Sequence, residues 1–425
     1  MKKTKKQLKY IDLFAGLGGF HIGLKKLGHK CVFASEKKEI LAELYDNNFD
    51  IKPNRDITSI SPEDVPKHDI LCAGFPCQPF SKAGDQKGLD DERNGNLFYS
   101  IFDILRYHKP KYFILENVAN LEKHDSGNTW EAIYELLVRG LGYTVDKKII
   151  SPHEVGIPQH RQRLFIVGSK NGLDHFQWPK KNTNELDIES FLDKSPKIIP
   201  LEDEKKYVLS LWQDFIDKLP ISTSLPSWPI WSMEFGATYP FEETTPYYSS
   251  SKKLGMCNGS FGIPLKGLSR EEKFHQLPSY ARVEQFEFPR WKKHFIRSNR
   301  EFYQKNRKYI ESPLRKIKKL EAQSWQKFEW NIKDGERNIS KHLVQFRGSG
   351  VRIKRFDYFP SLVTVSTQIP IIAKQERYLT PKEGARIQSL NGIKLPKNIG
   401  TCFSALGNAV NAKIVTLIAK SLINE

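Results

Sequence analysis

Short apolar runs alternate with amphipathic stretches over the first 170 residues of the chain. The apolar runs KYIDLFA, KCVFASE, HDILCAG, KYFILENV, YTVDKKII and RLFIVGS each have the length of a buried strand. Between them, GFHIGLKKLG, KEILAELYDNNF, GNLFYSIFDILRYH and NTWEAIYELLVRGLG space their apolar residues as helices do. Strands that alternate with helical patterns of about 10–15 residues predict an α/β fold with a doubly wound, mostly parallel sheet.

This alternation ends near residue 170, and the chain then becomes irregular and rich in Pro, Trp and Tyr up to about residue 370. Order returns in YLTPKEGARIQSL, where Thr380 is a predicted helix cap and Pro381 the first helical residue. The last segment, SALGNAVNAKIVTLIAKSLI, predicts a glycine turn followed by an apolar-striped helix. We therefore predict one domain from residues 1–175 and 376–425, and a second, irregular domain from residues 176–375.

The net charge of +18 over 425 residues favours a polyanionic partner, most often nucleic acid. An ordinary protein from a lysine-rich proteome is the alternative. The five cysteines form no CxxC pair and no zinc-ligand spacing, so we expect no metal and a reducing compartment. Because we find no signal-peptide core and no run of about 18 apolar residues, we expect a cytoplasmic protein without a membrane partner.

The segment DLFAGLGGF lies where the first predicted strand turns into the first helix. Glycines at such a turn let the backbone approach a ligand at the helix N-terminus. The GxGxxG pattern of dinucleotide binding is not met, because the sixth position counted from Gly16 is His21. Glu36 ends the next strand, where a carboxylate can bind ribose hydroxyls. Together, the glycine turn and Glu36 predict a site for a nucleoside cofactor without pyrophosphate, and S-adenosylmethionine is the obvious one. The alternative is a glycine turn that serves packing alone and binds no ligand.

Reactive and charged side chains follow several of the predicted strands. Cys77 comes after HDILCAG, whereas Cys72 lies within that strand and is predicted to be a buried apolar residue. The strand FILENV ends with Glu116 and Asn117, and the segment GIPQHRQRLFIVG brings Arg161 and Arg163 to the start of a further strand. Ligands of doubly wound sheets bind outside the carboxyl ends of the strands. We therefore expect a thiol, a carboxyl group and two guanidinium groups to converge at one sheet edge, although each residue taken singly could have a structural role.

These segments, in this order, resemble the DNA cytosine-5 methyltransferase family of bacterial restriction–modification systems. The matching blocks are DLFAGLGGFHIGL, the acidic strand end at Glu36, GFPCQPFS, ENV, QHRQR, YLTPKEGARIQSL and LGNAV. They cover roughly residues 8–170 and 376–423, and the irregular middle falls where this family carries its variable target-recognition region. The resemblance implies an S-adenosylmethionine-dependent methyltransferase fold with a second, DNA-recognition domain, acting on duplex DNA.

The resemblance also implies the chemistry of the four candidate catalytic residues. Cys77 would add to C6 of cytosine and thereby make C5 electron-rich enough to accept a methyl group. Glu116 would protonate or hydrogen-bond N3, which requires a carboxyl group close to protonation in a sheltered pocket. Arg163 would bind O2, and Arg161 would orient Glu116 or the nucleophile loop. The target base would be flipped out, because it cannot be reached inside a stacked duplex.

The same resemblance assigns the cofactor contacts to several segments of the chain. Glu36 is implied for the ribose, and Asp56 and Ile57 for the adenine. S-adenosylmethionine would be the methyl donor, and no metal is implied. The remaining implied cofactor contacts are Phe14, Gly16, Gly18, Pro76, Leu97 and Asn408.

The irregular middle of the chain is strongly basic. Between Arg290 and Lys327 there are 13 Lys or Arg against three Glu, which is typical of phosphate contacts, with a solvated helical face as the alternative. The segment ESPLRKIKKL predicts a helix that begins with Ser312 as cap and Pro313 at its first position. Ser361–Leu362 would occupy the usual Thr-Leu site of the family. The candidate DNA contacts are Ser81, Arg347, Arg352, Lys354 and Arg355.

A DNA cytosine-5 methyltransferase is the function that we favour, as a monomer paired with a cognate restriction endonuclease in the bacterial cytoplasm. A tRNA cytosine-5 methyltransferase on the same scaffold is disfavoured by the long basic middle of the chain. A catalytically silent DNA-binding protein is disfavoured by the intact Cys77, Glu116 and Arg163. An amino-methylating enzyme would carry a Pro-Pro-aromatic tetrad at the strand end, where this chain has Pro-Cys-Gln.

Overall fold

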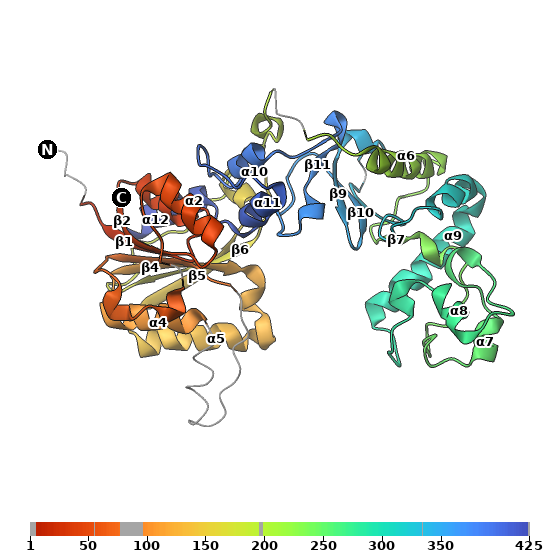
Figure 1. Cartoon of the computed structure of the whole chain (residues 1–425), viewed down its shortest axis with the longest axis horizontal. Coiled ribbons are helices and arrows are strands. Elements are labelled where there is room, and N and C mark those ends of the chain that lie inside the picture. The colour runs from red at the N-terminus through yellow and green to blue at the C-terminus, as the bar shows by residue number, and fades with distance from the viewer. Residues whose placement is uncertain (1–5, 55, 77–96, 195–198, 334, 424–425) are drawn as a thin grey trace. The chain divides into compact units, whose positions relative to one another are not determined.

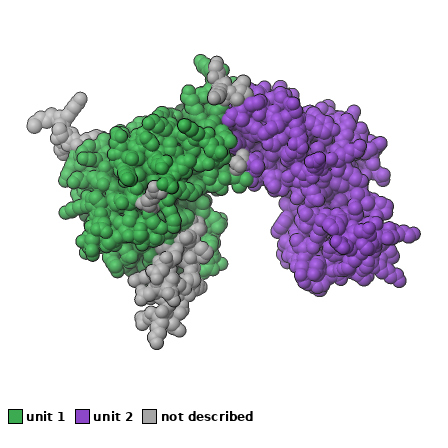
Figure 2. All heavy atoms as spheres, in the orientation of Figure 1, with its two compact units in different colours: residues 1–196, 357–366, 380–425 green, residues 197–356, 367–379 purple. Residues whose placement is uncertain are grey.

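The structure is a computed structural model that describes residues 6–54, 56–76, 97–194, 199–333 and 335–423. It contains two compact units (Figure 2). Unit 1 comprises Met1–Pro196, Asp357–Ser366 and Thr380–Glu425, and unit 2 comprises Lys197–Phe356 and Thr367–Leu379. Unit 1 thus takes in residues 176–196 and 357–366 besides most of the predicted first domain. The predicted roles of Cys77 and Ser81 concern positions outside the described residues.

Unit 1 is built on a six-stranded sheet of order β2-β1-β3-β4-β6-β5 (Figure 1). The first four strands pair in parallel, and β6 runs antiparallel to both of its neighbours. All six predicted strands form, which confirms the doubly wound, mostly parallel sheet. The strand order reverses between β1 and β3, which makes this the switch point where ligands bind in such sheets. The strands are β1 (Lys9–Leu13), β2 (Lys30–Ser35), β3 (Ile70–Gly74), β4 (Tyr112–Val118), β5 (Thr144–Ile150) and β6 (Arg163–Ser169).

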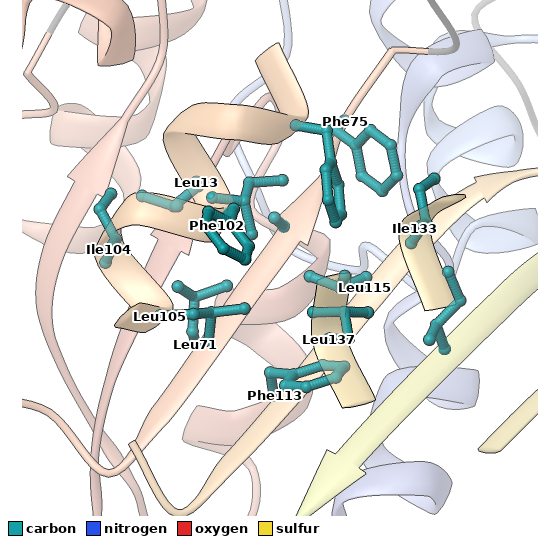
Figure 3. Packing of buried hydrophobic residues seen from close by; sticks show 14 of the residues in the cluster. Leu13, Leu71, Phe75, Phe102, Ile104, Leu105, Phe113, Leu115, Ile133 and Leu137 are labelled. Carbon is teal, nitrogen blue, oxygen red and sulfur yellow. The ribbon is translucent and has the colours of Figure 1, made fainter. Parts of the chain in front are cut away.

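Both faces of this sheet are covered by helices. In β3, Leu71 contributes to the core on one face and Cys72 to the core on the other, and both are fully buried. Figure 3 shows the first core, where Leu71 and Phe113 of the strands pack near Leu105 of α4. A strand buried on both faces explains why its sequence is a continuous apolar run, and the predicted burial of Cys72 is confirmed. The face that carries Leu71 is covered by α4 (Leu97–His108) and α5 (Asn128–Glu135). The face that carries Cys72 is covered by α1 (Gly19–Lys25) and α12 (Ala412–Leu422), and α2 (Glu39–Phe49) lies beside α1.

The end of the chain returns to the first strands through close packing of α12 on α1. A Cβ at Gly19 would lie 2.2 Å from the carbonyl oxygen of Val410, and one at Gly23 would lie 2.6 Å from Cγ1 of Val415. Helix α10 (Pro381–Ile387) begins with the predicted Thr380 cap, whose hydroxyl accepts from the backbone N–H of Glu383. These contacts make residues 380–423 part of the same unit as the sheet.

The predicted glycine turn before the last helix is wrong, because its residues SALGN end helix α11 (Ile399–Asn408). The chain breaks only at residues 409–411, where Asn411 caps α12. By length and composition alone, Ile399–Leu422 is apolar enough to cross a membrane. In this structure 67% of its most apolar window is buried, as in a core helix of a soluble protein.

Unit 2 contains a second six-stranded sheet, of order β12-β11-β9-β10-β8-β7, together with helix α6 (Asp203–Lys218), the short α7 (Ser251–Gly255) and α8 (Arg270–His275), and α9 (Arg290–Ile317). The predicted helix start at Ser312 is wrong, because Pro313 lies inside α9. Pro313 is buried with Ile310 and Ile317 on the apolar side of this helix, so packing overrides the local stop signal. The strands are β7 (Ile230–Trp231), β8 (Lys327–Asn331), β9 (Leu343–Arg347), β10 (Gly350–Lys354), β11 (Ile371–Ile372) and β12 (Arg377–Tyr378).

Candidate active site

Three strand ends of unit 1 bring candidate residues to one edge of the sheet. Gly74, the last residue of β3, is in register with Glu116 of β4. Because β6 runs antiparallel to β4, its first residue, Arg163, lies at the same edge, opposite Val118. The structure therefore places Glu116 and Arg163 together, as the sequence pattern predicts.

Glu116 is a buried carboxyl group in contact with a cation. It is 6% exposed, and its Oε1 atom lies 3.1 Å from Nε of Arg163. Burial raises the pKa of Glu116 above its ordinary value, and the charges of Arg163 and Arg161 oppose this rise. A Cβ at Gly74 would lie 3.1 Å from Cγ2 of Val410, so the glycine lets Val410 pack closely beside Glu116. A carboxyl group of this kind can hold a proton and donate it to a ring nitrogen.

A cavity of about 400 Å³ lies beside Glu116. This volume is within the range of about 300–1,000 Å³ that is usual for small-molecule sites. Glu116, Arg161 and Arg163 form part of its wall. Most of the implied cofactor contacts also line it, namely Phe14, Gly16, Glu36, Pro76, Leu97 and Asn408.

The glycine loop and Glu36 form one hydrogen-bonded unit at this cavity. Gly16 has a φ of 53°, and a Cβ there would meet only the carbonyl oxygen of Phe14, at 3.9 Å, so the backbone faces open space. The amide of Gly16 donates to Glu36 Oε2 at 2.9 Å, and the amide of Lys38 donates to Oε1 at 2.8 Å. An ionised carboxylate has about four acceptor positions, so Glu36 can still accept from the hydroxyls of a ribose. The apolar walls and this carboxylate fit a nucleoside such as that of S-adenosylmethionine.

Three implied cofactor residues do not line the cavity. Gly18 packs against helix α2, since a Cβ there would lie 2.3 Å from Cε2 of Phe49. The side chain of Asp56 accepts from the backbone N–H of Thr58 and forms an ion pair with Lys37 at 2.9 Å. Ile57 is 4% exposed and belongs to the core under α4. The structure thus gives local structural reasons for these three residue types.

Arg161 is 3% exposed, and its guanidinium group binds the C-terminal part of unit 1. Its Nη2 atom donates to the carbonyl oxygens of Gly407 at 2.6 Å and Ala409 at 3.1 Å. Its Nη1 atom donates to Ser361 Oγ and to the carbonyl oxygen of Leu362, both at 3.3 Å. Burial lowers the pKa of Arg161 to about 9, so the group stays charged at neutral pH. These bonds hold the two residues that flank Asn408 and do not go to Glu116.

Some residues of the site are not assigned from the sequence. Asn117 donates from Nδ2 to the carbonyl oxygen of Phe75 at 3.0 Å and so fixes the exit of β3. Lys38 and Val410 also line the cavity. Asn117 and Val410 belong to the blocks ENV and LGNAV, so their motifs are the signal that locates them.

The described cysteines are poor candidates for a nucleophile. Cys31, Cys72 and Cys402 are buried, and burial raises the pKa of all three thiols, for Cys402 to about 11. Cys257 is half-buried in unit 2. Within the described ranges, no three His, Cys, Asp or Glu side chains gather as metal ligands would.

The candidate DNA contacts of β9 and β10 are mostly engaged within unit 2. Arg352 forms an ion pair with Glu329, and Arg347 lies 4.0 Å from the same carboxylate. Arg355 donates from Nε to the carbonyl oxygen of Ile332 at 2.9 Å. Lys354 is the last residue of β10.

The doubly wound sheet, with its cavity outside the carboxyl ends of β1, β3 and β4, defines a protein of the S-adenosylmethionine-dependent methyltransferase fold. The family model for C-5 cytosine-specific DNA methylases matches residues 8–424, and the chain belongs to this family.

The chain is also similar to individual members. It is 46% identical over 205 residues to Type II methyltransferase M.HaeII of Haemophilus aegyptius, a match that covers 47% of this chain and 63% of that protein. It is 45% identical over 175 residues to Type II methyltransferase M.HhaI of Haemophilus parahaemolyticus, which covers 41% of this chain and 53% of that protein. The matches thus span between about half and three fifths of these relatives.

A solved structure shares the fold over almost the full length of the chain. It is a crystal structure of a prophage-encoded E. coli protein described as a DNA modification methyltransferase. The TM-score is 0.53 at 18% sequence identity, and the match covers 99% of this chain and 100% of that chain. At this identity the similarity concerns the fold alone.

Proposed function

We propose that the protein transfers a methyl group from S-adenosylmethionine to C5 of a cytosine that is flipped out of a specific duplex DNA site. The observation that carries the proposal is the contact between the buried Glu116 and the half-buried Arg163, 3.1 Å apart, in the wall of the cavity that the glycine loop also lines. This arrangement puts a proton donor and a fixed cation beside a nucleoside-sized space, and membership of the family supplies the substrate class.

The cavity residues would hold the cofactor. Glu36 would accept from the ribose hydroxyls, Phe14 and Leu97 would contact the apolar parts of the nucleoside, and the backbone at Gly16 would approach it closely. S-adenosylmethionine, when bound, supplies an electrophilic methyl group on a sulfonium. The hydrogen bonds from the backbone amides of Gly16 and Lys38 keep the Glu36 carboxylate oriented before the ligand binds.

The remaining chemistry lies in the residues that face the pyrimidine ring. The Cys77 thiolate would add to C6, while Glu116 donates a proton or hydrogen bond to N3 and Arg163 binds O2. The electron density that the new bond brings to the ring makes C5 nucleophilic. As C5 accepts the methyl group, the bond between the methyl carbon and the sulfonium sulfur would break, and the sulfur would keep the electron pair as a neutral thioether. Loss of the C5 proton to a base would then let the Cys77–C6 bond break, and the thiolate would leave as the aromatic ring re-forms.

Arg161 would act as a positioning residue in this scheme. Its hydrogen bonds to Gly407 and Ala409 fix the backbone on both sides of Asn408, a residue of the cavity wall. Its charge lies near enough to lower the pKa of Glu116 without a hydrogen bond to it. Arg161 would therefore shape the cofactor site and tune the acid.

The biological setting belongs to the same proposal. We place the protein in the bacterial cytoplasm, as a monomer that modifies DNA within a restriction–modification system alongside a cognate endonuclease. The naming of its relatives as Type II methyltransferases from Haemophilus species supports this setting.

Incubation with methyl-labelled S-adenosylmethionine and duplex DNA tests the function. We expect the label in 5-methylcytosine, with little transfer to tRNA, and loss of transfer in Cys77→Ser. Label on adenine N6 or cytosine N4 would refute the reaction, and preferential labelling of tRNA would refute the substrate. Bisulfite mapping of DNA from expressing cells would then give the site.

A further inference from the structure

Helix α9 belongs to unit 2 (Figure 1). One face of this helix carries a run of exposed cations. The run is named here the α9 stripe and ends in the turn that follows the helix. A helix has 3.6 residues per turn, and these positions fall on one side of it. From the first residue to the last the stripe is about 21 Å long, at 1.5 Å per residue. Its members are Lys305, Lys308, Arg315, Lys316 and Lys319, all exposed.

The opposite side of α9 anchors the stripe to the interior of unit 2. Ile296, Phe302, Ile310 and Ile317 are buried there and repeat at helical spacing. Asn299 on the same side accepts from the backbone N–H of Trp231 at 2.7 Å. A helix held in this way presents its outward cations at fixed positions.

The stripe differs from several other cations of α9 in lacking anionic partners. Arg297 pairs with Glu242 at 2.7 Å, Arg300 with Glu234 at 3.0 Å, and Arg307 with Glu311 at 3.2 Å. No stripe residue forms an ion pair with any carboxylate in the described part of the chain. Five neighbouring like charges without counter-charges repel one another, so the isolated fold gains nothing from their grouping.

The dipole of α9 accounts for only part of the stripe. Cations near a helix C-terminus are stabilised, but the effect fades within about one turn. This can explain Arg315 and Lys316, close to the end of α9 at Ile317. Lys305 and Lys308 lie more than two turns before that end. A ligand with a row of negative charges explains all five positions.

We infer that the α9 stripe binds the phosphate backbone of duplex DNA and does not read base sequence. The choice of DNA rests on the proposed function. A length of about 21 Å matches about six phosphates along one strand, at 3.4 Å of helix axis each. Phosphate contacts set affinity and register, whereas base edges carry sequence. The stripe therefore strengthens binding to any duplex, and site choice comes from other parts of the protein.

Two variants with equal charge loss on the same helix test this inference. Lys308→Gln with Arg315→Gln removes two stripe charges, and Arg297→Gln with Arg307→Gln removes two ion-paired charges. Binding of a fluorescent duplex longer than the stripe is measured by anisotropy over a range of KCl concentrations, without cofactor. We expect the slope of log K against log [KCl] to fall by about 1.8 in the stripe variant, at about 0.9 per phosphate contact, and to stay unchanged in the control. Lys308→Arg with Arg315→Lys keeps both positive charges, so its slope should equal that of the wild type.

Other outcomes would overturn the inference. An equal fall in both variants would mean that only net charge matters, and an unchanged slope in the stripe variant would mean that the stripe does not touch DNA. A larger effect on tRNA than on duplex DNA would assign the stripe to RNA. The proposed function is judged separately by methyl transfer. If 5-methylcytosine forms but the slopes are equal, only the stripe is refuted, whereas a stripe-dependent slope without 5-methylcytosine refutes only the enzyme.

Discussion

Replacing Arg161 by Met separates a positioning role from a direct role in catalysis. Met has similar length but cannot donate the four hydrogen bonds that Arg161 gives to Ser361, Leu362, Gly407 and Ala409. Three of these acceptors are backbone carbonyls. Each buried polar group left without a partner costs about 1–3 kcal/mol. Part of this loss is offset because the buried charge of Arg161 is also removed.

The net effect that we expect is a loss of about 3 kcal/mol in the local stability of residues 400–409. Amide hydrogen exchange measures this directly, and the amides of this segment should exchange roughly 100-fold faster in the variant. Affinity for S-adenosylmethionine, measured by calorimetry, should fall with it because Asn408 is no longer held. Arg161→Lys keeps the charge but not the forked geometry, and it should be intermediate.

Arg163→Met is the matched control, because Arg163 contacts Glu116 and none of the C-terminal carbonyls. It should lower methyl transfer and leave exchange in residues 400–409 unchanged. The reasoning is refuted if Arg161→Met abolishes methyl transfer while exchange and cofactor affinity remain those of the wild type. That result would give Arg161 a direct part in the chemistry.

Three further changes test other parts of the structure. Glu116→Gln should slow methyl transfer by about 10²–10⁴-fold. Burial raises the folded-state pKa of Glu116, so the wild type loses stability as pH rises from near 4.5 through that raised pKa. Denaturation at several pH values should therefore show the difference in stability moving in favour of the variant over this window. A difference that stays constant with pH, or moves in favour of the wild type, would contradict this sign. Gly19→Ala should lower the free energy of unfolding by about 1–3 kcal/mol, because its Cβ would meet the Val410 carbonyl, whereas Gly348→Ala, where nothing lies within 4 Å, is the neutral control in a thermal melt. Trp212→Ala should lower the free energy of unfolding of unit 2, measured in urea, by about 3–5 kcal/mol, because this fully buried ring stacks on Phe328 with ring centroids 4.7 Å apart. The affinity for S-adenosylmethionine should be unchanged.

The sheet of unit 1 is predictable from the sequence because its signal is local. Strands buried on both faces are continuous apolar runs, and the helices between them carry a clear apolar stripe. The Thr380 cap is likewise a short-range pattern, with its partner Glu383 three residues on. Family order places Glu116 and Arg163 at strand ends, and the register of β4 and β6 then brings them together.

Other features depend on contacts between distant segments and cannot be read from local patterns. The Ser312–Pro313 pair has the appearance of a helix start, but burial of Pro313 beside Ile310 and Ile317 keeps it inside α9. Three of the four partners of Arg161 are backbone carbonyls about 200 or more residues further along, and no residue pattern identifies such acceptors. Glycines at positions 16 and 18 look alike in sequence, yet the first faces the cavity and the second packs against Phe49.

A duplex in which 5-fluorocytosine replaces the target cytosine tests the central claim most directly. Fluorine at C5 cannot leave as a proton, so the bond between Cys77 and C6 should persist after methyl transfer. In the presence of S-adenosylmethionine we expect a protein–DNA adduct that survives denaturation, maps by mass spectrometry to the peptide with Cys77, and is absent in Cys77→Ser. The claim would be contradicted if the protein methylated ordinary DNA but formed no adduct, or if Cys77→Ser formed as much adduct as the wild type.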